Sequence, residues 1–120
     1  MVAKSKDFNE LLLCSIDEAL LSLGESVKQS TYFHIENRFR VSREDIPENL
    51  PQFQYGVEKI FGLGARYLEI LVMKNLYTKI GRPLDMHKND QLEFIKYVDA
   101  ARKNYLKNAP TRITAKDNSS

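Results

Sequence analysis

Apolar residues recur every three or four positions along most of this chain, which is the spacing of one face of an α-helix. The pattern predicts five helices, over about residues 8–23, 26–40, 51–61 and 64–80, and from residue 89 or 90 to about 107. No alternating apolar run between hairpin turns indicates a strand. The predicted fold class is therefore all-α, a compact bundle of about five helices.

Turn and capping residues set the predicted ends of these helices. Asp7 with Glu10 resembles a capping pair, and Ser26 is a candidate cap for the second helix. Glycines 24, 62 and 81 follow the first, third and fourth helices, where a left-handed residue commonly ends a helix. Between residues 41 and 51 the chain is a connector, in which Pro47 is expected to stop a single helical turn over residues 43–45.

The fourth predicted helix is apolar on nearly every side, so we expect it to be central in the bundle. Four of its residues can serve the domain core: Leu68, Leu71, Val72 and Ile80. Four others remain for a second face: Tyr67, Ile70, Met73 and Tyr77. This second face is either core covered by the other helices or a surface for self-association or for a partner protein.

Composition favours one soluble domain without cofactor or metal. The 120 residues are 42% hydrophobic and 28% charged, which suits a single helical domain over 8–107 between a short extension, 1–7, and a flexible polar tail, 108–120. Cys14 is the only cysteine, which is expected to be a small buried residue and suits a reducing compartment. There is no signal-peptide pattern and no apolar run long enough for a bilayer, so we expect a cytoplasmic protein that does not bind membranes.

Charge is distributed unevenly along the chain. Residues 1–65 hold seven basic and ten acidic side chains, whereas residues 66–120 hold eleven and six. Such an uneven distribution of charge could aid head-to-tail association or contact with an acidic partner, but a mixed solvated surface is the simpler explanation. Within the basic part, Arg102, Lys103 and Lys107 are candidate contacts to nucleic-acid phosphates.

No motif identifies a reaction. Gly62-Leu63-Gly64 lacks the third glycine of a dinucleotide loop, because Tyr67 stands there, and it follows a helix rather than a strand. His34, His87 and Cys14 have no spacing typical of a zinc site or of a nucleophile with its base. We therefore expect no catalytic, cofactor-binding or metal-binding residues, and a protein that is not an enzyme.

Several stretches together resemble an archaeal family, the Nitrosopumilus-type output domain, formerly a domain of unknown function. They are Ile16-Asp17-Glu18-Ala19-Leu20, Leu23-Gly24-Glu25-Ser26-Val27, Tyr32-Phe33-His34-Ile35-Glu36, Asp45-Ile46-Pro47 and Glu58-Lys59-Ile60-Phe61-Gly62-Leu63-Gly64-Ala65. The resemblance covers about residues 8–82 and concerns helix boundaries and apolar positions. It implies an intracellular helical module, found alone or at the output end of sensory proteins, with no known activity or cofactor.

Three functional hypotheses follow. The first is a non-enzymatic interaction or signal-output module that acts by helix-helix association, as a homodimer or with another protein. The second is a nucleic-acid-binding module that uses the basic fifth helix. The third is a small-molecule sensor with a pocket between helices, for which the sequence offers no discriminating residue.

Overall fold

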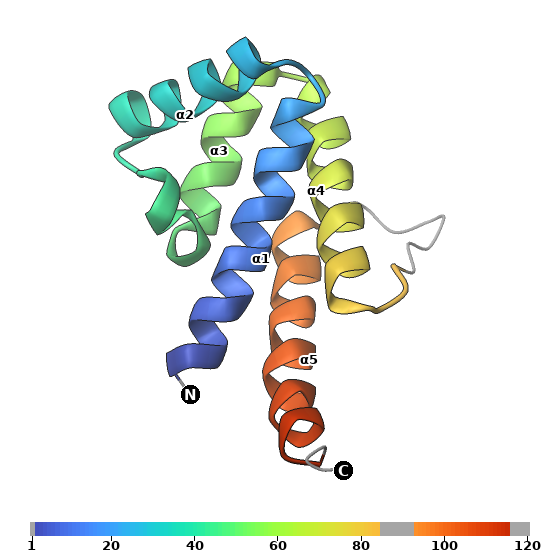
Figure 1. Ribbon diagram of the computed structural model, residues 1–120. Helices are drawn as coiled ribbons and strands as arrows, with labels where there is room; N and C mark the ends of the chain where they lie inside the picture. Colours follow the sequence, from blue (N-terminus) through green and yellow to red (C-terminus); the bar gives the residue numbers. More distant parts are fainter. Residues whose placement is uncertain (1, 85–92, 116–120) are drawn as a thin grey trace.

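The computed structural model describes residues 2–84 and 93–115, with side chains described over 6–84 and 93–107. Its elements are α1 (Val2–Leu21), α2 (Glu25–Phe39), the 3-10 helix η1 (Arg43–Glu48), α3 (Leu50–Phe61), α4 (Gly64–Ile80) and α5 (Phe94–Ala115). Every regular element in these ranges is a helix (Figure 1). The predicted all-α bundle is confirmed.

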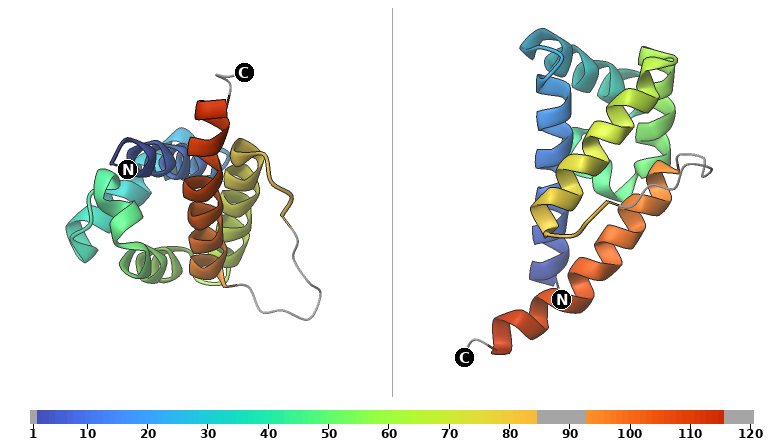
Figure 2. Two further views of the ribbon diagram at one scale, coloured as in Figure 1. Left: turned by 90° about the horizontal axis from the view of Figure 1, so that it is seen from below. Right: turned by 90° about the vertical axis from the view of Figure 1, so that its right-hand side faces the viewer.

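Two helices share the centre of the bundle. α1 packs against α2, α4, α5 and η1, and α4 packs against α1, α3 and α5. Figure 1 shows α1 in the middle, with α2 crossing beyond its C-terminal end and α4 running antiparallel to it. In Figure 2, the C-terminal part of α5 extends past the rest of the bundle. The first helix is thus as central as the fourth, which the apolar pattern alone had singled out.

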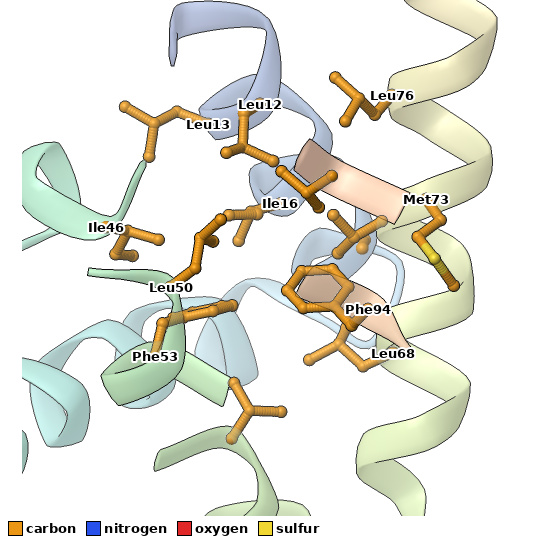
Figure 3. Packing of buried hydrophobic residues seen from close by; sticks show 14 of the residues in the cluster. Leu12, Leu13, Ile16, Ile46, Leu50, Phe53, Leu68, Met73, Leu76 and Phe94 are labelled. Atoms are coloured by element: carbon orange, nitrogen blue, oxygen red, sulfur yellow. The ribbon is translucent and has the colours of Figure 1, made fainter. Parts of the chain in front are cut away.

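The core is formed by one apolar side of each helix. Phe8, Leu12, Ile16 and Leu20 recur at helical spacing on α1 and are completely buried. Figure 3 shows residues of α1 and η1 facing those of α3, α4 and α5 across this core. The fully buried ring of Phe94 brings the first turn of α5 into the same cluster. Burial of a large apolar side chain contributes about 1.5–3 kcal/mol, so these contacts are the main source of stability.

The helix boundaries follow the predictions most closely in α3 and α4. Pro51 lies in the first turn of α3, Gly62 ends that helix with φ 59°, and Gly81 ends α4 with φ 72°. These positive values of φ favour glycine because it has no Cβ. The bounds of α4, Gly64–Ile80, are those that the pattern predicted.

Other boundaries differ from the predictions. α1 begins at Val2, so Asp7 lies inside it and does not cap it, because residues 2–6 contain no glycine or proline to stop the helix. α2 begins at Glu25 after Gly24, so Ser26 is not its cap either.

The connector and the last helix also differ. η1 continues through Pro47 to Glu48. The backbone N–H groups that donate its 3-10 hydrogen bonds include those of Asp45 and Asn49, so the missing N–H of Pro47 does not interrupt them. α5 continues to Ala115, beyond the predicted end at residue 107. The predicted caps of α5, Asn89 and Asp90, lie outside the described residues, as do His87 and residues 116–120.

A close approach of α2 and α3 depends on one glycine. A Cβ built on the buried Gly56 would lie 2.5 Å from Cδ1 of Ile35 and 3.0 Å from Cδ2 of Phe39. Contacts this short between carbon atoms are strongly repulsive, and the completely buried Ile35 has little room to move.

We therefore expect Gly56→Ala to lower the free energy of unfolding by about 1 kcal/mol. Overpacking costs about 1–3 kcal/mol, which outweighs the roughly 1 kcal/mol that alanine gains over glycine inside a helix. Urea denaturation measures the change. The control is Gly64→Ala at the first residue of α4, whose Cβ would have no neighbour nearer than 3.9 Å and which we expect to be neutral or slightly stabilising.

The clash can be traced to one methyl group. Ile35→Val removes Cδ1, and by itself it should cost about 0.5–1.5 kcal/mol. In the Gly56→Ala background it should cost clearly less, because the same change relieves the clash. Strict additivity of the two substitutions would contradict the close approach.

Candidate interaction surface

The corner between α3 and α4 presents an apolar side chain to solvent. Leu63 stands between Gly62 and Gly64, has helical φ and ψ of −65° and −22°, and is 101% exposed relative to a reference leucine. Because its backbone is already helical, its side chain is in register with Tyr67 one turn further on, which is 59% exposed.

This exposed pair continues along α4 into partly buried residues. Ile70 and Leu71 lie one further turn along and pack partly against the core. Lys74, exposed, follows after another turn. We call Leu63, Tyr67, Ile70 and Leu71 the outer stripe of α4. In the right-hand view of Figure 2, α4 lies at the front of the molecule.

Two residues of the predicted second face do not belong to this stripe. Met73 is 0% exposed and Tyr77 is 9% exposed. The hydroxyl of Tyr77 donates a hydrogen bond of 2.8 Å to the carbonyl oxygen of Tyr97 on α5. The two alternatives for Tyr67, Ile70, Met73 and Tyr77, covered core or open surface, therefore divide between them: Met73 and Tyr77 are core, and Tyr77 is bonded to α5, whereas Tyr67 is exposed and Ile70 is partly buried.

The exposed charges of α1 are mostly acidic, and those of α4 are basic. Asp7, Glu10 and Glu18 are exposed on α1 beside one exposed base, Lys6, whereas Arg66 and Lys74 are exposed on α4. At the seam between the helices, Lys79 Nζ lies 2.8 Å from Glu18 Oε2, and Asn75 Nδ2 donates to the carbonyl oxygen of Ser15 at 3.2 Å. The two neighbouring helices thus form one face with an acidic and a basic side.

Cys14 belongs to this face rather than to the core. It is exposed on α1, which contradicts the expectation of a small buried residue. Its two sequence neighbours, Leu13 and Ser15, are both buried. Cys14 therefore lies on the side of α1 that faces away from the core.

The three candidate nucleic-acid contacts, Arg102, Lys103 and Lys107, have different surroundings in the structure. Arg102 holds α5 against the bundle: its Nη1 donates to Asn9 Oδ1 at 3.0 Å, and its Nη2 donates to the carbonyl oxygen of Pro47 at 3.1 Å. Lys103 and Lys107 are exposed on α5. Arg102 therefore has a structural role, and the exposed candidates for phosphate contact among the three are the two lysines.

A polar cluster that the sequence did not reveal ties α1 to α2 and η1. Asp17 Oδ1 accepts a hydrogen bond of 2.5 Å from the hydroxyl of Tyr32 and one of 3.1 Å from Nε of Arg43. Nη2 of Arg43 donates to Asp17 Oδ2 at 2.5 Å. Partial burial opposes ionisation of Asp17, but the bonds from Arg43 and Tyr32 outweigh it and lower its pKa. Burial and the neighbouring carboxylate raise the pKa of Tyr32.

We expect Asp17→Asn to lower the free energy of unfolding at pH 7 by about 1–2 kcal/mol, since it removes a charged acceptor from a partly exposed cluster. A carboxyl whose pKa is lowered on folding stabilises the fold above its ordinary pKa, here 3.8, and loses that effect as the pH falls through the lowered value. The difference between the two proteins in chemical denaturation should therefore shrink below about pH 4.

Glu44→Gln is the matched control for this experiment. Glu44 lies 3.7 Å from Arg43 but its side chain is 75% exposed, so we expect little change in stability. An Asp17→Asn variant that is no less stable than this control at pH 7 would contradict a stabilising role for the cluster.

Glu69 is a second carboxyl with a perturbed environment. It is 6% exposed on α4, and Nε2 of Gln54 on α3 approaches its Oε2 at 3.4 Å. Burial raises its pKa, and the nearby charge of Glu58 adds to this effect. The folded protein therefore favours the protonated form of Glu69 more than the unfolded chain does.

We expect Glu69→Gln to increase stability at neutral pH. A carboxyl whose pKa rises on folding favours the fold fully below its ordinary pKa, here 4.5, and this effect is lost as the pH rises through the raised value. The Tm difference in favour of the variant should grow between about pH 4.5 and pH 7. The exposed Glu36→Gln on α2 is the control, and equal Tm differences at both pH values would argue against the burial effect.

His34 is the histidine that the structure describes, and it stands apart from the acidic side chains discussed above. His34 is half-buried on α2, with its ring in edge contact with Phe33 at a centroid distance of 5.6 Å. Within residues 2–84 and 93–115, no group of three or more histidine, cysteine or acidic residues is placed to hold a metal ion.

Within the described ranges, no helix is both long enough and apolar enough to cross a bilayer.

The architecture defines the class of protein as a small all-α bundle with an exposed stripe on one central helix. No family model, curated protein or solved structure matches the chain. The resemblance to the Nitrosopumilus-type output domain has no support from these comparisons and stays a prediction.

Proposed function

We propose that this protein is a non-enzymatic helical interaction module that forms a homodimer through the outer sides of α1 and α4. The observation that carries the proposal is the outer stripe of α4, in which Leu63 is fully exposed and Tyr67 is more than half exposed. An exposed apolar row on a central helix of a small domain is typical of an interaction surface.

The energetic gain is concentrated in this stripe. Leu63 loses no intramolecular contact on binding, so its burial contributes close to the full 1.5–3 kcal/mol of a leucine side chain. Tyr67 has the ring and hydroxyl that are typical of interface hot spots. In a two-fold dimer each residue contributes twice, once from each copy.

The charges of the same face favour a second copy over an unrelated partner. With Asp7, Glu10 and Glu18 on α1 and Arg66 and Lys74 on α4, each copy carries both signs on one face. A two-fold axis that passes between the helices brings the acidic side of one copy beside the basic side of the other, so the face is complementary to itself.

Sedimentation equilibrium of the full chain tests the proposal. We expect a monomer-dimer equilibrium for the wild-type protein and a shift to monomer by at least tenfold in Kd for Leu63→Ser and for Tyr67→Glu. Both side chains are exposed, so both variants should keep the Tm of the monomeric fold.

Phe33→Ser is the matched control, because Phe33 is 61% exposed but lies on α2. It should leave the dimer unchanged. A wild-type chain that stays monomeric at several hundred micromolar would contradict the proposal, as would equal effects of Tyr67→Glu and Phe33→Ser.

A further inference from the structure

A cleft of about 440 Å³ lies between α5 and the junction of η1 with α3. Its size is within the range of small-molecule sites. The apolar part of its lining comes from both sides: Pro47, Leu50 and Pro51 on one, and Ile95 on the other. Three charged residues, Glu48, Asp99 and Arg102, complete it.

The guanidinium group of Arg102 is held in position in this cleft before any ligand binds. Two of the five N–H groups of Arg102 are used by Asn9 and by the carbonyl oxygen of Pro47. The guanidinium carbon also lies 4.9 Å from the centre of the Phe8 ring, in a cation-π arrangement. Three N–H groups are left over, on a guanidinium whose position is already determined, so little conformational entropy is lost when it binds an anion.

The two carboxylates stand on opposite walls. Glu48 is at the end of η1, where its Oε2 accepts a hydrogen bond of 3.2 Å from Asn9 Nδ2. Asp99 is on α5, one turn before Arg102 and exposed. Among the described residues, the ion pairs within 4.0 Å do not include Asp99. Its carboxylate is therefore available to a cation.

One fixed guanidinium, an available carboxylate and an apolar lining match a small molecule that carries both charges on an apolar body. We propose that the cleft binds a zwitterion of this kind, an α-amino acid with an apolar side chain. Its carboxylate would bind the remaining N–H groups of Arg102, its ammonium group Asp99, and its side chain Leu50 and Ile95. Charge-assisted hydrogen bonds of both kinds are the strong ones.

This inference is independent of the proposed dimer, because the cleft residues lie on η1, α3 and α5 whereas the outer stripe lies on α4. Sedimentation of an Asp99→Asn variant should give the same dimer as the wild-type protein. A loss of ligand binding and a loss of association are thus separate results.

Calorimetric titration of the full chain with L-leucine tests the proposal. Two analogues serve as controls: isoamylamine, which lacks the carboxylate, and 4-methylpentanoate, which lacks the ammonium group. We expect saturable binding of leucine and at least tenfold weaker binding of both analogues. No heat of binding up to about ten millimolar leucine, isoleucine or methionine would overturn the proposal, and so would equal binding of the amine or of the acid.

The residue assignment is tested with Asp99→Asn, which should weaken leucine binding by about tenfold or more. Glu36→Gln, an exposed acid on α2, is the control and should bind as the wild-type protein does. If Asp99→Asn lowers the Tm, amide shifts at Ile95 and Arg102 of the wild-type protein on leucine addition report the site directly. Unchanged affinity in Asp99→Asn, or leucine-induced shifts that spare both amides, would overturn the assignment.

Discussion

The structure depends on the burial of one side of α1 by four other elements. α2, α4, α5 and η1 all pack against this helix. Its completely buried residues include an aromatic ring near the N-terminal end, Phe8, and aliphatic side chains from there to Leu20. Because protein interiors are closely packed, each neighbour of α1 also restricts the positions of the others. Because four elements pack against α1, only a narrow strip of this helix is exposed to solvent.

Polar contacts fix the parts of the fold that have little apolar area. η1 is only six residues long and buries Ile46 and Pro47. It is held at its start by the bonds of Arg43 to Asp17 and near its end by the bond of Arg102 to Pro47. These bonds connect η1 to α1 and α5, so a short segment becomes a defined wall of the bundle. The same contacts place Arg102 in the cleft between η1 and α5.

The proposed dimer surface and the proposed ligand cleft arise at different places in this packing. The outer stripe of α4 is what remains after α1, α3 and α5 have covered the other sides of that helix. The cleft is the space left between the η1-α3 junction and α5, where charged and apolar side chains line it together. Both are positioned by rigid helices, which suits recognition that requires little rearrangement.

Much of the fold could be predicted from the chain alone, because helix periodicity and glycine positions are local properties. The bounds of α4 and the turn at Gly62 follow from residues within a few positions of each other. The continuation of η1 through Pro47 was missed, because a 3-10 turn tolerates a proline that an α-helix at the same place does not.

Local patterns in the chain are enough to predict which residues are apolar and where the third and fourth helices end. The packing of the helices against one another covers Met73 and Tyr77, leaves Leu63 and Tyr67 exposed and turns Cys14 to solvent. It also brings Asp17 to Arg43 and Arg102 to Asn9, pairs that are 26 and 93 residues apart. The physical reason is that periodicity describes a helix relative to its own axis, whereas exposure and long-range pairing depend on which other helix lies against each side.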